Sequence, residues 1–408
     1  MPALSTKLLP ATILERAPEV SVRVSAHESV RIAIDGVERA VDPHALALLA
    51  AFERPRALGD VIAELGAHRH GARDWIDLTA TAYQLVEAGV LRRLDEPQGA
   101  LRLRGRGFDA PSLQLAMLDD HARTSAFLAA IAETVSPGDV VLDLGTGSGI
   151  LAVAAARAGA RRVYAVEAGD IGRVAQAVFE SNGVADRVTL LRGWSTRLDL
   201  PERANVLVTE TLGHEPLAEG FLETVLDARR RHLADNARIV PACISVVAVA
   251  VELSSEDRRR LVLDAAAVNE WTALYGIDLT PLATAARFSA GESVLMSPAQ
   301  LRTVRMLSPP TVVATLRTAG LTSPTVELTS ICEVTAQGRL DALVTFFDLE
   351  LARNRSLSTS FLSASRGSHW KHPVRVLADG PLVRPGDRFE ASYRYGGGDA
   401  ALSVRVLP

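Results

Sequence analysis

Two glutamates nine residues apart, Glu210 and Glu219, follow a short apolar run at 205–209 that is typical of a β-strand. In open α/β sheets, ligands approach the loops that follow the strands. Paired carboxylates suit a planar cation with forked donors, because bidentate charge-assisted bonds fix both its position and its orientation. The alternative interpretation is that both are solvated surface carboxylates, the commonest fate of glutamate.

A glycine-rich turn lies between a buried apolar run and the start of a helix in 140–150, whose sequence is VVLDLGTGSGI. Gly145 and Gly147 allow backbone conformations and close approaches that a Cβ would prevent. The next apolar run ends in Glu167, where an acidic residue can accept hydrogen bonds from ribose hydroxyls. The spacing G-x-G-x-G after an acidic residue, Asp143, is the pattern of class I methyltransferases, whereas nicotinamide enzymes usually have G-x-G-x-x-G. We therefore expect an S-adenosyl-L-methionine crevice in which Asp143 orients the glycine turn, with a ligand-free turn as the alternative.

Four stretches between Leu113 and the C-terminus resemble the protein arginine methyltransferase family. They are the helix 117–124 (MLDDHART), the double-glutamate loop 210–219, the segment 271–278 that resembles the start of a dimerisation arm, and 368–371 (SHWK), which resembles the T-H-W loop of the β-barrel domain. Four such stretches in this order are highly specific. The resemblance implies an arginine N-methyltransferase that needs no metal, in which the two glutamates hold a guanidinium in line with the sulfonium methyl.

The resemblance also assigns roles to other positions. Arg123 should bind the methionyl carboxylate of the cofactor. Asp120 and His369 should pair across the domain boundary, where His369 can accept the proton that the product sheds. Met117 and Trp370 should lie beside the acceptor, although ordinary helix core is an equally good interpretation of Met117.

Several positions depart from the family pattern. The helix that closes over the cofactor normally carries two tyrosines, and the corresponding stretch 104–108 reads RGRGF. Thr196 is expected in the cofactor site, where the family has an acidic residue that binds the adenine amino group. The loop segment 211–214 is Thr-Leu-Gly-His in place of Trp-Met-Gly-Tyr, and Phe221 replaces a methionine. These changes affect the acceptor pocket and the lid more than the reaction centre, so they leave the substrate and the number of methyl groups open.

The pattern of elements predicts three parts, at 1–100, 101–240 and 241–408. The predicted fold class is α/β, with a Rossmann-like class I methyltransferase domain followed by a β-barrel domain that carries a helical dimerisation arm at about 256–284. The first part is predicted to contain two strands, a hairpin turn, three helices and a last strand, at 20–24, 30–34, 35–36, 43–51, 58–65, 75–89 and 90–91. This order resembles a small winged-helix or PqqD-like α+β domain, and a packing or dimerisation module is the alternative.

Bulk composition limits the partners. The chain has 408 residues, 48% of them hydrophobic, and a net charge of −4. Because no basic excess is present, we expect no nucleic-acid partner. No apolar run reaches the roughly 20 residues that span a bilayer, so we expect no membrane partner. Without a recognisable secretory signal, and with two isolated cysteines, the composition favours a cytoplasmic location.

Two acceptors remain open. Free L-arginine in a natural-product pathway is slightly favoured, because no acidic run offers a track for a basic peptide; such a protein would resemble the bacterial arginine methyltransferase of streptozotocin biosynthesis. An arginine within a peptide or protein is the alternative, favoured if the N-terminal part binds a leader. A homodimer formed through the arm is expected in either case. A regulator with a vestigial cofactor site is the other class of function, and a methyltransferase for hydroxyl or carboxylate groups ranks below both.

Overall fold

The computed structural model describes residues 8–17, 20–24, 30–34, 37–41, 44–67, 72–94, 109–261, 265–281, 293–363, 368–377 and 379–407. The expected lid stretch 104–108 lies outside the described residues. The chain divides into two compact units. The first comprises residues 1–111 with 168–174 and 192–194, and the second comprises the rest of the chain.

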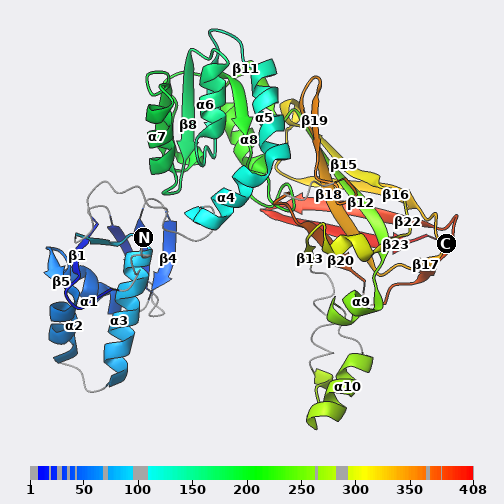
Figure 1. The fold of residues 1–408 in the computed structure, drawn as a ribbon, viewed down its shortest axis with the longest axis horizontal. Helices are drawn as coiled ribbons and strands as arrows, with labels where there is room; N and C mark the ends of the chain where they lie inside the picture. The colour runs from blue at the N-terminus through cyan, green and yellow to red at the C-terminus, as the bar shows by residue number, and fades with distance from the viewer. Residues whose placement is uncertain are drawn as a thin grey trace. The chain divides into compact units, whose positions relative to one another are not determined.

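The first unit contains two small antiparallel sheets and three helices, drawn in blue in Figure 1. The sheets have the strand orders β5-β1-β6 and β2-β3-β4. The strands are β1 (Ile13–Arg16), β2 (Val20–Val24), β3 (Val30–Ile34), β4 (Val37–Val41), β5 (Arg56–Ala57) and β6 (Leu91–Arg93). The helices are α1 (His44–Ala51), α2 (Leu58–Ala67) and α3 (Ala72–Glu87). Ile34 pairs with Val37, so the predicted turn at 35–36, itself outside the described residues, falls between the partners of a hairpin.

The core of this unit forms where the apolar faces of the helices meet. Leu48, Phe52, Leu78 and Leu85 are buried together with Leu14 of β1. The helices follow the predicted apolar spacing because those positions recur on one face. Strands β1, β4 and β5 were not predicted from the sequence.

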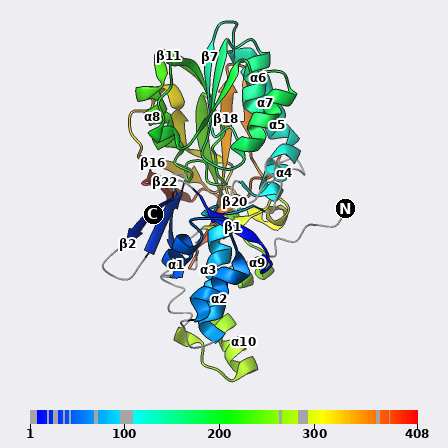
Figure 2. The same cartoon turned by 90° about the vertical axis from the view of Figure 1, so that its left-hand side faces the viewer.

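A five-stranded sheet of order β11-β10-β7-β8-β9 forms the Rossmann-like part of the second unit. Its strands are β7 (Val140–Leu144), β8 (Arg162–Glu167), β9 (Val188–Arg192), β10 (Ala204–Thr209) and β11 (Leu233–Val240). The pairs β10–β11, β7–β10 and β7–β8 are parallel. The associated helices are α5 (His121–Thr134), α6 (Ile150–Arg157), α7 (Gly172–Ser181) and α8 (Phe221–Arg231). Figure 2 shows α5 and α6 on one side of β7 and α8 on the other.

The helix expected over 117–124 is broken within its length, because the structure has two helices, α4 (Pro111–Asp119) and α5. Asp120 separates them, because it leaves the helical conformation and its Oδ1 accepts the backbone N–H of Arg123 at 3.1 Å. This is an N-cap, which satisfies one of the free donors at the start of α5. The other carboxylate oxygen, Oδ2, accepts the backbone N–H of His369.

Antiparallel strands make up the remainder of the second unit, a β-barrel domain. They form a seven-stranded sheet, a three-stranded sheet of order β16-β22-β23 and the pair β17–β21. The strands are β12 (Cys243–Glu252), β13 (Ser293–Met296), β14 (Arg305–Met306), β15 (Thr311–Arg317), β16 (Val326–Glu333), β17 (Gly338–Arg339), β18 (Ala342–Ala352), β19 (Arg355–Ser358), β20 (His372–Val376), β21 (Leu382–Val383), β22 (Arg388–Gly396) and β23 (Asp399–Val406).

Ile239 and Val240 are the last residues of β11 in the parallel sheet. The central strand β18 is buried along nearly its whole length. Both of its faces are covered, because Phe347 joins the core shared with the Rossmann-like sheet while Phe346 joins a second core inside the barrel.

The arm consists of α9 (Ser255–Leu261) and α10 (Ala265–Tyr275). The guanidinium of Arg258 is paired with the buried carboxylate of Asp341, which holds α9 on the barrel. Beyond this anchor the arm exposes Leu274, Tyr275 and Ile277, which are 69%, 62% and 59% accessible. No helix among the described residues is long and apolar enough to cross a membrane.

Candidate active site

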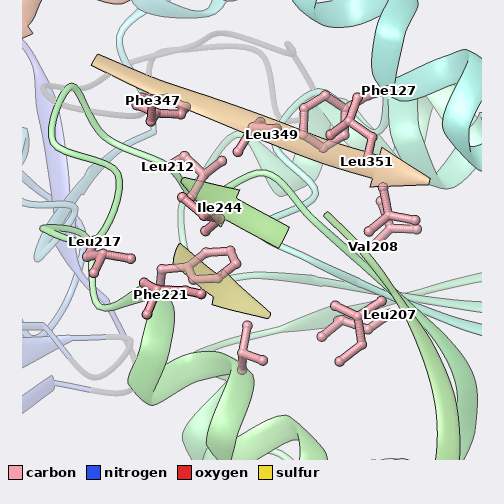
Figure 3. Close-up of a cluster of buried hydrophobic side chains, with 14 of the residues drawn as sticks. Phe127, Leu207, Val208, Leu212, Leu217, Phe221, Ile244, Phe347, Leu349 and Leu351 are labelled. Atoms are coloured by element: carbon pink, nitrogen blue, oxygen red, sulfur yellow. The ribbon is translucent and has the colours of Figure 1, made fainter. Parts of the chain in front are cut away.

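The loop between the two predicted glutamates is fixed to the core at both ends. Thr209, the last residue of β10, donates its hydroxyl to the carbonyl of Leu144 at 3.1 Å, so the ends of β10 and β7 are joined. Leu212 and Leu217 are buried. Figure 3 shows both leucines in one apolar cluster with Phe221 of α8 and Ile244 of β12. The apolar side chains of the loop therefore decide where its carboxylates lie.

The glycine turn lies beside this loop. The backbone N–H of Gly147 donates to Oε2 of Glu167 at 2.9 Å, so the turn is hydrogen-bonded to the end of β8. Gly145 has φ of +71°, and a Cβ there would lie 2.7 Å from Cγ2 of Thr211. Asp143 is fully buried beneath the turn and accepts the hydroxyl of Thr146 at 2.6 Å. Burial raises the pKa of Asp143 to about 7, against the opposing effect of that hydrogen bond.

Arg123 lies beside the first glutamate of the loop. Its Nη2 donates to Oε2 of Glu210, and its Nη1 donates to the carbonyl of Met117 at 2.9 Å. The Glu210 side chain is only 6% exposed. Desolvation raises the pKa of Glu210, and the positive charge of Arg123 partly offsets the rise. The same guanidinium lies 5.9 Å from the centre of the Trp370 ring, a cation–π distance.

Three buried polar atoms in this region lack a hydrogen-bond partner among the described residues. They are Oδ1 of Asp143, Nε of Arg123 and Oε1 of Glu210. Buried atoms of this kind are uncommon, because leaving a donor or acceptor desolvated and unpaired is costly. A free guanidinium N–H suits the carboxylate of a methionyl group, and free carboxylate oxygens suit N–H or O–H donors. The residues present therefore fit S-adenosyl-L-methionine and a cationic acceptor.

Asp120 and His369 are paired as the sequence predicts. Oδ2 of Asp120 lies 3.0 Å from Nδ1 of His369 and accepts the backbone N–H of His369 at 3.1 Å. Burial alone would raise the pKa of Asp120, but the hydrogen bonds from His369 and from the Arg123 backbone lower it overall. Asp120 is therefore a carboxylate, so Nδ1 carries the shared hydrogen and Nε2 of His369 is left to accept a proton.

Glu219, the second predicted glutamate, has no hydrogen-bond or ion-pair partner in the part of the chain that the structure describes. A Cβ on Gly213 would lie 2.9 Å from its Oε1, so the carboxylate folds back against the loop. Desolvation, and then the charge of Glu210, raise the pKa of Glu219 to about 7. The residue as a whole is exposed.

The remaining predicted residues are placed less directly. Met117 is half-buried on α4, and its backbone carbonyl is the group that contacts Arg123. Trp370 is buried, and its Nε1 donates to the carbonyl of Leu212 at 3.1 Å, so it supports the loop from behind. Thr196 is exposed on the short helix η2 (Ser195–Arg197) and takes part in none of these interactions. Among the described residues, no group of three or more His, Cys, Asp and Glu side chains could hold a metal ion.

Sequence reasoning missed two residues of the loop itself. Nδ1 of His214 accepts the backbone N–H of Lys371 at 3.2 Å, and burial lowers the pKa of His214. Oε1 of Glu215 accepts the hydroxyl of Tyr393 at 2.5 Å. Both residues lie between the two predicted glutamates. A third carboxylate in so short a loop, Glu215, could have indicated a further functional residue from the sequence alone. Their partners, however, lie more than 150 positions later in the chain.

Comparison with known proteins identifies the family. A profile of the ribosomal protein L11 methyltransferase (PrmA) family matches residues 119–235. A probable protein arginine N-methyltransferase 6 of Arabidopsis thaliana is 35% identical over 178 residues, which are 43% of this chain and 39% of that protein. Protein arginine N-methyltransferase 1 of Schizosaccharomyces pombe is 30% identical over 277 residues, which are 66% of this chain and 78% of that protein.

Two solved structures share the fold. A chain of the Trypanosoma brucei PRMT1 enzyme–prozyme heterotetrameric complex with AdoHcy has a TM-score of 0.63 and 23% identity, covering 73% of this chain and 94% of that chain. Arabidopsis thaliana protein arginine methyltransferase 10 has a TM-score of 0.59 and 22% identity, covering 74% and 98%.

These similarities establish that the chain belongs to the protein arginine N-methyltransferase family, a family of S-adenosylmethionine-dependent enzymes. The predicted family, cofactor and pairing of a Rossmann-like domain with a β-barrel are confirmed. The matched region is about a third of two Arabidopsis relatives, 39% of one and 32% of the other.

Proposed function

We propose that this protein transfers a methyl group from S-adenosyl-L-methionine to a guanidino nitrogen, with free L-arginine as the acceptor. The observation that carries the proposal is the pair of carboxylates on one loop. Among the described residues, Oε1 of the buried Glu210 has no hydrogen-bond partner, and the nearby charge of Glu210 raises the pKa of Glu219. A guanidinium offers donors to both carboxylates, and its charge offsets their mutual repulsion.

The chain contributes orientation and proton transfer. When bound, S-adenosyl-L-methionine supplies an electrophilic methyl group on a positively charged sulfur. Glu210 and Glu219 hold the acceptor so that one nitrogen faces that methyl group, which converts an encounter into an oriented approach. Arg123 binds the cofactor carboxylate, and its positive charge opposes the rise in the pKa of the buried Glu210. Nε2 of His369 accepts the proton that the methylated nitrogen sheds, while Asp120 holds the ring.

Two features support free arginine as the acceptor. The loop segment 211–214 departs from the family pattern beside the acceptor, and no run of acidic residues offers a track for a basic peptide. An arginine in a peptide or protein is the second candidate, supported by the names of the relatives. It is also supported by the N-terminal unit, which we interpret as a winged-helix or PqqD-like domain that binds a leader. With free arginine as the acceptor, we propose a role for the enzyme in natural-product biosynthesis.

A labelled-methyl assay distinguishes these acceptors. Free L-arginine and an arginine-bearing peptide are each incubated with the protein and S-adenosyl-L-methionine carrying a labelled methyl group. We expect label in free arginine and none after Glu219→Gln, while S-adenosylhomocysteine binding in calorimetry is unchanged. Glu223→Gln, a matched change on α8 outside the clamp, should retain activity. If label appears only in the peptide, the acceptor is a peptide arginine and not free arginine. Full activity of Glu219→Gln would refute the proposed clamp.

A further inference from the structure

The double-glutamate loop carries a third carboxylate, Glu215, midway between the two clamp residues. Oε1 of Glu215 accepts the hydroxyl of Tyr393 at 2.5 Å and the backbone N–H of Leu217 at 3.3 Å. Both donors point to one oxygen, so a single side chain joins the middle of the loop to strand β22 of the barrel. Desolvation raises the pKa of Glu215 to about 7. Tyr393 is buried as well, with 1% of its surface exposed.

The loop is folded tightly around this residue. The backbone N–H of Ala218 donates to the carbonyl of Glu215 at 3.2 Å, and that carbonyl lies 3.0 Å from where a Cβ of Gly213 would be. The same Cβ position lies 2.9 Å from Oε1 of Glu219. Any shift of Glu215 would therefore be transmitted to the Glu219 carboxylate, since both pack on Gly213.

Strand β22 presents a second tyrosine that acts as an internal comparison. Tyr393 and Tyr395 are two residues apart, so they lie on the same face of the strand. The Tyr395 hydroxyl donates to Oε2 of Glu223 at 2.8 Å. Glu223 is in the first turn of α8 and beyond the clamp loop. Each hydrogen bond joins a buried tyrosine hydroxyl to a glutamate carboxylate, and only the Tyr393 bond reaches the clamp loop.

We propose that Glu215 and Tyr393 are positioning residues that fix the acceptor clamp, setting where Glu219 meets the guanidinium. The inference rests on the proposed function for its link to methyl transfer. Glu215 acts as a hydrogen-bond acceptor for the barrel and not as a third ligand of the acceptor. An uncharged amide that keeps the carbonyl oxygen should therefore replace it, which distinguishes it from the two clamp carboxylates.

The test compares Tyr393→Phe with its matched control Tyr395→Phe. Because the loop loses its tie to the barrel, Tyr393→Phe should raise KM for the guanidino acceptor about tenfold. The affinity for S-adenosylhomocysteine should stay the same, and Tyr395→Phe should change neither quantity. Equal acceptor KM values for the two variants would overturn the proposal.

Two further variants test the role of the charge. Glu215→Gln should keep near wild-type KM, whereas Glu215→Ala should behave like Tyr393→Phe. If Glu215→Gln abolishes methylation as Glu219→Gln does, Glu215 is a ligand of the acceptor and the positioning role is wrong.

Amide hydrogen exchange provides a readout that does not need activity. Tyr393→Phe should speed exchange of the amides of Leu217, Ala218 and Gly220 relative to Tyr395→Phe, since these amides hold the loop turn. If the wild-type protein labels no guanidino acceptor, the proposed function fails, while the exchange rates still decide the positioning role. Unchanged exchange in Tyr393→Phe would overturn it.

Discussion

The guanidinium of Arg123 is hydrogen-bonded to the carboxylate of Glu210, so the residue assigned to the cofactor and the residue assigned to the acceptor form one ion pair. The pair is nearly buried, with 13% and 6% of the two side chains exposed. Burial raises the pKa of Glu210, and the adjacent positive charge opposes that rise. We therefore expect the proposed cofactor site and the proposed acceptor site to be linked through this ion pair.

Replacing Arg123 by lysine should weaken both sites. An ammonium cannot simultaneously reach Glu210, the carbonyl of Met117 and a cofactor carboxylate, whereas the planar guanidinium has donors for all three. Calorimetry should show affinity for S-adenosylhomocysteine falling about tenfold or more. Arg187→Lys, a change on the loop before β9, serves as the control. Unaltered affinity in Arg123→Lys would contradict the assignment of Arg123 to the cofactor.

Acceptor turnover should fall as the pH is lowered. The pKa of Glu219 is raised to about 7 by desolvation and by the charge of Glu210. A carboxyl group with a raised pKa loses its negative charge as the pH falls through that value, and the clamp needs the charge. We expect kcat/KM for the acceptor to drop about tenfold per pH unit below the pKa. S-adenosylhomocysteine affinity measured over the same range should remain flat; a flat kcat/KM between pH 8 and pH 6 would contradict the prediction.

The same shift implies that Glu219 lowers folding stability at high pH. Because its folded-state pKa is raised, its contribution to stability is fully present below the unfolded value of 4.5 and is lost as the pH rises through the folded value of about 7. Glu219→Gln should therefore have a higher Tm than the wild type at pH 8, and the difference should vanish near pH 4. A lower Tm for the variant at pH 8 would show that the carboxylate stabilises the loop.

Gly145→Ala should disturb the glycine turn. Gly145 has φ of +71°, and the new Cβ would lie 2.7 Å from Cγ2 of Thr211. The backbone strain alone is expected to destabilise the protein by about 1–3 kcal/mol. Adding Thr211→Ser removes the clashing methyl group. The double variant should therefore regain the stability lost to the steric clash, while the loss caused by backbone strain at position 145 remains. Denaturant titrations of the two single variants and the double variant measure the coupling; strict additivity would refute the clash.

Asp120→Asn should separate the two roles of Asp120. Asparagine is as good an N-cap as aspartate, so the stability of α5 should hardly change. The anionic partner of the His369 ring is lost, so kcat should fall while Tm stays within about 2 °C of the wild type. Asp120→Ala should in addition lose about 1 kcal/mol of stability, because the cap is removed. Full kcat in Asp120→Asn would show that the charge next to His369 is not required.

The arm should mediate self-association. Leu274, Tyr275 and Ile277 together expose an apolar surface that water disfavours, and a second copy of the chain would cover it. Sedimentation velocity should show a dimer for the wild type and a shift towards monomer for Leu274→Asp. Leu382→Asp, a change at a leucine that is 83% exposed outside the arm, should leave the dimer intact. A monomeric wild type would contradict the prediction.

Local features of the site could be predicted from the sequence. The strand, glycine turn and helix around Gly145 and Gly147 follow from apolar runs and from residues that tolerate positive φ, which are properties of near neighbours. The family resemblance placed Asp120 opposite His369, 249 positions away, and the structure has that pair. The break between α4 and α5 was not predicted, because helical spacing continues across Asp120. The break depends on the non-helical backbone of Asp120, whose side chain caps the start of α5.

The amino-acid sequence alone predicted the family and the cofactor, and it singled out Glu210 and Glu219 as the proposed clamp, because each inference depends on residue types at short, fixed spacings. Only the tertiary structure decided which carboxylates are already engaged: Glu210 by Arg123, and Glu215 by Tyr393, 178 positions away. Such contacts depend on how the barrel packs on the Rossmann-like sheet. Residues that far apart meet only after the apolar core has closed, so no local pattern encodes their pairing.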